Sequence, residues 1–290
     1  MQIRHLRQKV VLATTFVILA IYILIHIWIA RGNHSFVFPE INEDATYFYT
    51  DKLPSFGIDF DKLTLNSKFG NVEACTMPSR SSNNVWILHL HSTNTLFYSD
   101  KNIWRYRIWN NLGVHIFTLN YITEENDKPT SSPEKMYQSA ELALQFLEEK
   151  MEIPEDRILV YGEGLGAYPA VLLSKRNPKL GGLILENGIT NLHDYLQDLF
   201  PIIAIRYLFK EEFPVIENLR KTEVPTLFIA SEKDETFPHR HTKLLYEASP
   251  AIVKRIVILK KNIQKIKNKD AKTYQKALSD FLRELKLRVI

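Results

Sequence analysis

The chain has 290 residues, of which 45% are hydrophobic and 24% are charged, so its composition is that of a folded protein rather than a disordered one. A net charge of +4 is too small to indicate a nucleic-acid partner. The single cysteine excludes an intramolecular disulfide and a cysteine-based zinc site. Only 10 residues are glycine, where average usage of about 7% predicts roughly twice as many. This shortage excludes glycine-rich low-complexity designs.

Residues 10–30 form an almost uninterrupted apolar segment. At about 1.5 Å per residue, a helix of this length crosses the core of a bilayer. A cleaved signal peptide is the alternative, but its apolar region is shorter and ends in a small-x-small site, so we predict a retained signal anchor. Arg4, Arg7 and Lys9 precede the segment, and Arg31 follows it. The positive-inside rule therefore predicts a single-pass type II protein, with residues 1–9 cytosolic and the globular part lumenal or extracellular, in the endoplasmic reticulum or another endomembrane.

Six short apolar runs follow in the soluble part of the chain, and they have the pattern of strands buried on both faces of a parallel sheet. They are residues 85–90, 114–119, 158–161, 183–185, 226–230 and 256–259. Helical patterns lie between them. Ser131, Ser132 and Pro133 begin one helix as a cap, and an apolar stripe at 274–287 predicts an outer C-terminal helix. The alternation predicts an α/β fold with a doubly wound, mostly parallel sheet.

Residues 190–221 break this alternation, because they are apolar and aromatic without a strand-like run. We predict a helical insertion above the carboxyl edge of the sheet. The predicted organisation is a cytosolic N-terminus (1–9), a transmembrane anchor (10–30), an N-terminal extension with edge strands (31–80) and an α/β domain (81–290) that contains the insertion.

The sequence Gly-Glu-Gly-Leu-Gly at 162–166 follows the strand predicted at 158–161 and precedes a helix. A strand, a tight turn with glycine on both sides of its centre, and a helix form the geometry of a nucleophile elbow. The central residue here is Gly164, which has no side chain. A glycine-rich turn of this kind also fits a dinucleotide phosphate, although the complete Gly-x-Gly-x-x-Gly spacing is absent.

At these residues the chain resembles the membrane-anchored α/β-hydrolase-domain proteins related to the yeast Bem proteins. The resemblance begins near Phe38-Pro39-Glu40 and includes Leu-Ile-Leu-Glu-Asn at 183–187, Pro-Thr-Leu-Phe-Ile-Ala-Ser-Glu-Lys-Asp-Glu at 225–235 and Leu-Leu-Tyr-Glu-Ala-Ser-Pro at 244–250. It implies the α/β-hydrolase fold with a helical cap, and an ester or thioester hydrolase activity that needs no metal and no cofactor.

The resemblance also implies where a catalytic triad would stand. The nucleophile position holds Gly164, the acid position Asp234, and the histidine position Gln264. The oxyanion positions are Ser92 and Thr93, where the family has Gly-Asn after a histidine, and Leu165 after the elbow centre. Glycine supplies no oxygen and glutamine exchanges no proton near neutral pH, so the mechanism of a serine hydrolase is lost.

Several polar residues offer alternatives to an inactive site. Ser92 or Thr93 could attack with the help of His91, His239 or His241, but we interpret these residues as ordinary loop and helix-end groups.

Three further features have simpler interpretations. His89 and His91 share a strand face but have no third ligand at metal-binding spacing, and Glu163 is expected at the surface. Eight basic residues in 254–272 could meet anionic lipid, although a solvated face is the simpler interpretation.

We therefore predict a catalytically inactive α/β-hydrolase-like protein with a binding or scaffolding role. Its predicted partners are the bilayer, through residues 10–30, and an acyl or lipid-like ligand. The alternative is an active ester or thioester hydrolase, for example an acyl-protein or palmitoyl-protein hydrolase, with a non-standard nucleophile.

Overall fold

The computed structural model describes residues 2–37, 51, 53–68, 70–80, 84–93, 96–122, 132–209, 212–234, 236–261 and 269–287. The strands are β1 (Asp61–Ser67), β2 (Gly70–Met77), β3 (Trp86–Leu90), β4 (His115–Leu119), β5 (Ile158–Glu163), β6 (Gly182–Glu186), β7 (Thr226–Ser231) and β8 (Lys254–Leu259). The helices are α1 (Gln2–Val37), α3 (Leu53–Ser55), α4 (Asp100–Asn111), α5 (Pro133–Gln145), α6 (Ala167–Arg176), α7 (Leu192–Leu199), α8 (Ile205–Leu208), α9 (Val215–Leu219), α10 (His239–Ala248) and α11 (Lys269–Glu284).

The strands form one eight-stranded sheet in the order β1-β2-β4-β3-β5-β6-β7-β8. The pairs β1–β2 and β2–β4 are antiparallel, and the other neighbours are parallel. All six predicted runs are strands of the parallel part. In β3, β5, β6 and β7 every residue is buried, as expected of strands covered on both faces.

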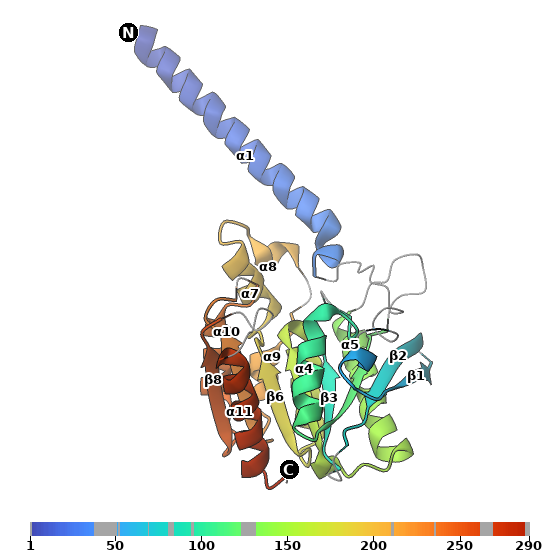
Figure 1. Cartoon of the computed structure of the whole chain (residues 1–290). Helices are drawn as coiled ribbons and strands as arrows, with labels where there is room; N and C mark the ends of the chain where they lie inside the picture. Colours follow the sequence, from blue (N-terminus) through green and yellow to red (C-terminus); the bar gives the residue numbers. More distant parts are fainter. Residues whose placement is uncertain are drawn as a thin grey trace.

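Helices cover both faces of the sheet (Figure 1). Side chains of α4 and α11 join one hydrophobic core, and those of α5, α6 and α10 join the other. The start of α5 follows from its sequence: the Ser132 hydroxyl accepts a hydrogen bond from the Lys135 N–H at 3.2 Å, and Pro133 occupies the first turn. The C-terminal helix begins at Lys269, five residues before the predicted start, and its described helical part ends at Glu284.

The predicted helical insertion is present, because α7, α8 and α9 follow the carboxyl end of β6. We refer to the residues of these helices and the turns between them, 190–221, as the cap. Its inward side chains, among them Leu196, Ile205 and Phe209, belong to the core that also contains the elbow residue Leu165. The cap therefore lies over the edge of the sheet where the strands end.

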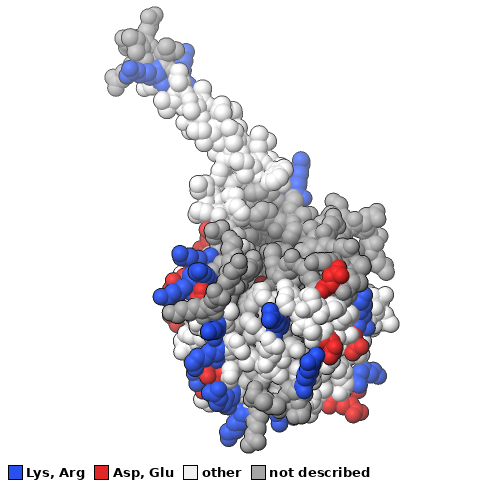
Figure 2. Space-filling view, viewed as in Figure 1, with Lys and Arg blue, Asp and Glu red and all other residues white. Residues whose placement is uncertain are grey.

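The N-terminal helix α1 extends away from the domain (Figure 1). Its segment Arg7–Trp28 has a mean hydropathy of 2.6, and its side chains are not buried against the domain. Figure 2 shows basic side chains at the free end of the helix, followed by a long uncharged stretch. By length and composition this helix can cross a membrane.

Candidate functional site

The turn after β5 has the geometry that a nucleophile elbow requires. The 3-10 turn Gly164–Gly166 connects β5 directly to α6, and Gly164 has a φ of +54°, in the left-handed region that favours glycine. A Cβ at Gly162 would lie 2.7 Å from the Ala170 Cβ, and one at Gly166 would overlap the Leu90 carbonyl oxygen. The flanking glycines are therefore required by the close approach of strand and helix.

The space in front of Gly164 is filled by an aromatic ring. A Cβ at Gly164 would lie 2.6 Å from Cζ of Phe237 and 2.9 Å from the Ser92 Oγ. Phe237 is 5% exposed, and its ring stacks on that of Tyr195 from α7, with centroids 5.3 Å apart and an interplanar angle of 17°. A larger residue at Gly164 would have to displace this stacked pair.

Asp234 follows β7, where the family resemblance implies an acid, but its carboxylate organises its own turn. One oxygen, Oδ1, accepts hydrogen bonds from the N–H groups of Thr236 and Phe237, each at 2.9 Å. The other, Oδ2, accepts one from the Asn187 amide at 3.0 Å. Burial raises the pKa of Asp234, and the two backbone donors oppose that shift. The carboxylate thus holds the turn that places Phe237 against Gly164.

The remaining predicted positions are only partly within the described residues. Ser92, Thr93 and Leu165 are all buried, and Ser92 and Leu165 lie beside Gly164. Gln264, predicted to stand in place of the histidine, lies outside the described residues. The structure therefore brings the elbow, Ser92 and the Asp234 turn together.

Beneath the elbow lies a buried ion cluster that the sequence interpretation missed. Arg105 of α4 donates to Glu163 Oε1 at 2.9 Å, to Asn102 Oδ1 at 2.7 Å and to both carboxylate oxygens of Glu186. Glu163 is 3% exposed, so its predicted surface position is wrong. Burial acts against the charge of Arg105, but Glu163 and Glu186 outweigh it and raise the pKa of the guanidinium. Asn102 and Arg105 lie on the same helix face as Tyr106 and Trp109. This spacing in the sequence could have indicated that the two polar residues are buried.

Three aromatic residues extend this cluster across the sheet. The Tyr161 hydroxyl donates to Glu186 and lies 2.9 Å from the Tyr274 hydroxyl, which accepts a hydrogen bond from Trp109 Nε1 at 3.0 Å. Burial raises the pKa of Glu186, while Arg105 opposes that effect. The cluster joins the end of β5, the end of β6, α4 and α11.

Among the described residues, the histidines near the elbow have structural partners rather than metal-binding geometry. His89 Nδ1 lies 3.1 Å from the Tyr106 hydroxyl, and His91 Nδ1 lies 2.8 Å from the Ser92 carbonyl oxygen. Burial lowers the pKa of His91 to about 4. His241, at the start of α10, lies 2.8 Å from the Thr190 hydroxyl. No group of three metal-binding side chains occurs in the part of the chain that the structure describes.

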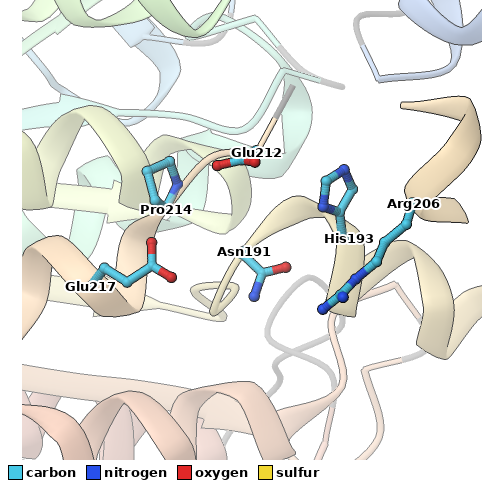
Figure 3. Close-up of a pocket in the computed structure, with 6 residues that line it drawn as sticks. All are labelled: Asn191, His193, Arg206, Glu212, Pro214 and Glu217. Atoms are coloured by element: carbon cyan, nitrogen blue, oxygen red, sulfur yellow. The ribbon is translucent and has the colours of Figure 1, made fainter. Parts of the chain in front are cut away.

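The cap contains a polar cavity of about 420 Å³. Figure 3 shows the six side chains that line it, from Asn191 and His193 at the start of α7, Arg206 of α8, and Glu212, Pro214 and Glu217 near α9. The lining contains neither Gly164, Ser92 nor Asp234. This cavity is therefore separate from the elbow.

The fold matches that of solved enzymes. An α/β hydrolase from Vibrio vulnificus superposes with a TM-score of 0.66 at 14% identity, over 88% of this chain and 90% of the other. The chain has the α/β-hydrolase fold. Other solved structures with the same arrangement are esterases and a monoglyceride lipase, at identities that show the fold alone.

Sequence relatives agree with the fold. The α/β-hydrolase domain-containing protein WAV2 of Arabidopsis thaliana is 27% identical over 154 residues, which is 48% of this chain and 50% of the relative. An uncharacterized membrane protein of Saccharomyces cerevisiae is 25% identical over 213 residues, 72% of this chain and 74% of the relative. The chain spans about half the length of the first three relatives it matches. No protein-family model matches the chain.

Proposed function

We propose that this chain is a membrane-anchored α/β-hydrolase-fold protein that has lost hydrolase catalysis and has a binding or scaffolding role. The observation that carries the proposal is the elbow centre. Gly164 provides no nucleophile, and the Phe237 ring fills the space that a nucleophilic side chain needs. Loss of the nucleophile from a serine protease costs about 10⁶ in turnover, and a second loss adds little.

The role of Asp234 supports the same conclusion. In an active enzyme the acid orients the catalytic histidine, and we propose that the histidine position is occupied by Gln264. Both carboxylate oxygens of Asp234 instead accept hydrogen bonds from neighbouring N–H groups. We propose Gly164, Asp234 and Gln264 as a vestigial triad, with Ser92, Thr93 and Leu165 as vestigial oxyanion positions.

We propose that α1 is the signal anchor of a single-pass type II protein. Its length and hydropathy support a membrane span. Arg4, Arg7 and Lys9 before the apolar segment support a cytosolic N-terminus. A protease added to sealed microsomes should spare the globular domain, and digestion of that domain would reverse the orientation.

The ligand that we propose is an acyl or lipid-like molecule held under the cap. Solved esterases and a lipase with this fold support that chemistry by analogy. The apolar and aromatic side chains between the cap and the elbow, among them Tyr195 and Phe237, support an apolar ligand.

A fluorophosphonate probe tests the loss of catalysis, because it labels activated serines covalently. The wild-type chain should remain unlabelled in detergent and in membranes. A restored variant then tests whether the pocket persists. Gly164→Ser with Gln264→His leaves Phe237 in the way, so the informative variant adds Phe237→Ala. Hydrolysis of short acyl esters by the triple variant alone is the expected result.

The alternative is an active hydrolase, and one distance favours Ser92 as its nucleophile. Its hydroxyl oxygen lies 2.9 Å from the Cβ position of Gly164, close to where the family's serine would stand. Labelling of the wild-type chain that Ser92→Ala abolishes would overturn the inactive assignment. Labelling that survives Ser92→Ala would place the nucleophile at another serine.

A further inference from the structure

The anchor helix and the cap are in direct contact. The Tyr22 hydroxyl of α1 donates to the Ile202 carbonyl oxygen at 3.3 Å, and the Ala204 N–H donates to His26 Nε2 at 3.2 Å. Both contacts are with the turn 200–204 between α7 and α8. Figure 1 shows α1 reaching the domain on the side of the cap.

These contacts place the turn 200–204 beside the last part of the membrane-spanning segment, not beyond the end of that segment. Tyr22 and His26 belong to the span Arg7–Trp28. At about 1.5 Å per residue, Tyr22 lies roughly 9 Å before Trp28 along the helix axis. A tryptophan at the end of a span marks the membrane–water interface. The turn 200–204 therefore lies at the depth of the interface, where headgroups meet acyl chains.

The side chains that the cap presents at this depth suit a bilayer and not water. We define the cap edge as the exposed side chains Pro201, Ile202 and Tyr207, together with Arg206, which is exposed beside them and also lines the polar cavity. Ile202 is 81% exposed and Tyr207 is 91% exposed, although Ile205 between them is buried. Aliphatic and aromatic side chains with one nearby cation match an interface of acyl chains and phosphates.

The sequence around the cap edge has the same character. Between Asp198 and Lys210 the only charged residue is Arg206. The inward residues of this stretch pack into the core beneath the cap. Among the described residues, no apolar side chain covers the outward ones. The contact with α1 indicates what covers these side chains. Because α1 is surrounded by lipid where it crosses the bilayer, lipid also lies beside the part of the cap that touches it.

We propose that the cap edge is a membrane-inserting surface, seated in the phospholipid leaflet that α1 leaves as it enters the globular domain. The proposal depends on α1 spanning the membrane and is independent of whether the elbow is inactive. Its consequence is that the cap lies between the elbow and the bilayer. An apolar ligand would then reach the space under the cap from the leaflet rather than from water.

Site-specific fluorescence on the full chain tests this surface. Cys75 is fully buried, and burial raises the pKa of its thiol, so the wild-type chain serves as the unlabelled blank. An environment-sensitive NBD probe is attached at Ile202→Cys or at Tyr207→Cys, in phosphatidylcholine nanodiscs. Ile252→Cys is the matched control. Ile252 is apolar and 99% exposed, and it precedes β8, so it lies at the amino end of the parallel strands, whereas the cap lies at their carboxyl end.

The probes at 202 and 207 should emit at shorter wavelength than the probe at 252. Nitroxide groups on the lipids should quench them, and aqueous iodide should quench them less than it quenches position 252. Equal iodide quenching at all three positions, without lipid quenching, would overturn the proposal. Shielding from iodide without quenching by lipid would also overturn it, since a protein surface then covers the cap edge. Alkaline extraction of cell membranes that contain the full chain distinguishes failure of the anchor from failure of the cap contact.

Discussion

Replacing Arg105 with methionine tests whether the buried ion cluster stabilises the fold. The change removes the cation and leaves Glu163 and Glu186 buried without their shared partner. Breaking a buried ion pair costs about 3–5 kcal/mol, and 1 kcal/mol corresponds to about 2–4 °C in a domain of this size, so Tm should fall by about 6–20 °C.

The same substitution should make stability depend on pH in a defined direction. Burial already raises the pKa of Glu186, and Arg105 is the main group that opposes this effect, so its removal raises that pKa further. Folded Glu186 then keeps a proton that the unfolded chain releases above about pH 4.3. Stability from a raised carboxyl pKa is complete below the unfolded value and is lost as pH rises through the folded one. The variant should therefore lose more stability at pH 8 than at pH 5.

Thermal unfolding of the full chain in detergent, followed by circular dichroism, measures both effects. Arg107→Met is the matched control, because Arg107 is on the same helix but exposed. Its replacement removes only a cation–π contact with the Phe56 ring and should change stability by about 1 kcal/mol or less. If the two variants have the same Tm at pH 8, the ion cluster does not stabilise the fold.

Three further changes test other parts of the site by the same thermal assay. Gly166→Ala should cost about 3 kcal/mol or more in stability, because its Cβ meets the Leu90 backbone. Gly57→Ala is the control: there is open space around it, and only its positive φ disfavours alanine, so it should cost about 1–2 kcal/mol. Equal losses for the two variants would contradict this. Tyr274→Phe should cost about 1–2 kcal/mol through its lost hydrogen bonds, and an unchanged Tm would show that they contribute nothing. His91→Gln should remove up to about 3 kcal/mol of pH-dependent stability, because the lowered pKa of His91 makes wild-type stability fall as pH drops from 6.5 to about 4; an unchanged slope would contradict the assignment.

The central sheet could be predicted from sequence because burial on both faces leaves a simple pattern. The runs at 85–90 and 226–230 are continuous apolar stretches, and they became β3 and β7 with every residue buried. The edge strands β1 and β2 were expected only as a region. Along β1 only Leu63 and Leu65 are apolar, and so short an apolar pattern does not distinguish a strand from a loop in the sequence.

The contacts around the elbow could not be predicted, because they join residues far apart in the chain. Phe237 is 73 positions after Gly164, and nothing in its local sequence indicates that its ring faces the elbow. Arg105 is 81 positions before Glu186, and only its place on the buried stripe of α4 signals a partner. Pairings of this kind follow from the strand order, which the sequence pattern leaves open.

The glycines of the elbow are required for two different physical reasons. Gly162 and Gly166 are needed because strand and helix backbones approach too closely for any Cβ, whatever the central residue does. Gly164 has a positive φ, which a nucleophilic serine can adopt only under strain of about 1–3 kcal/mol. Glycine at the centre removes that strain, and the Phe237–Tyr195 stack fills the space it leaves. The backbone of the elbow is therefore compatible with glycine at its centre, and the close packing of β5 against α6 does not depend on which residue stands there.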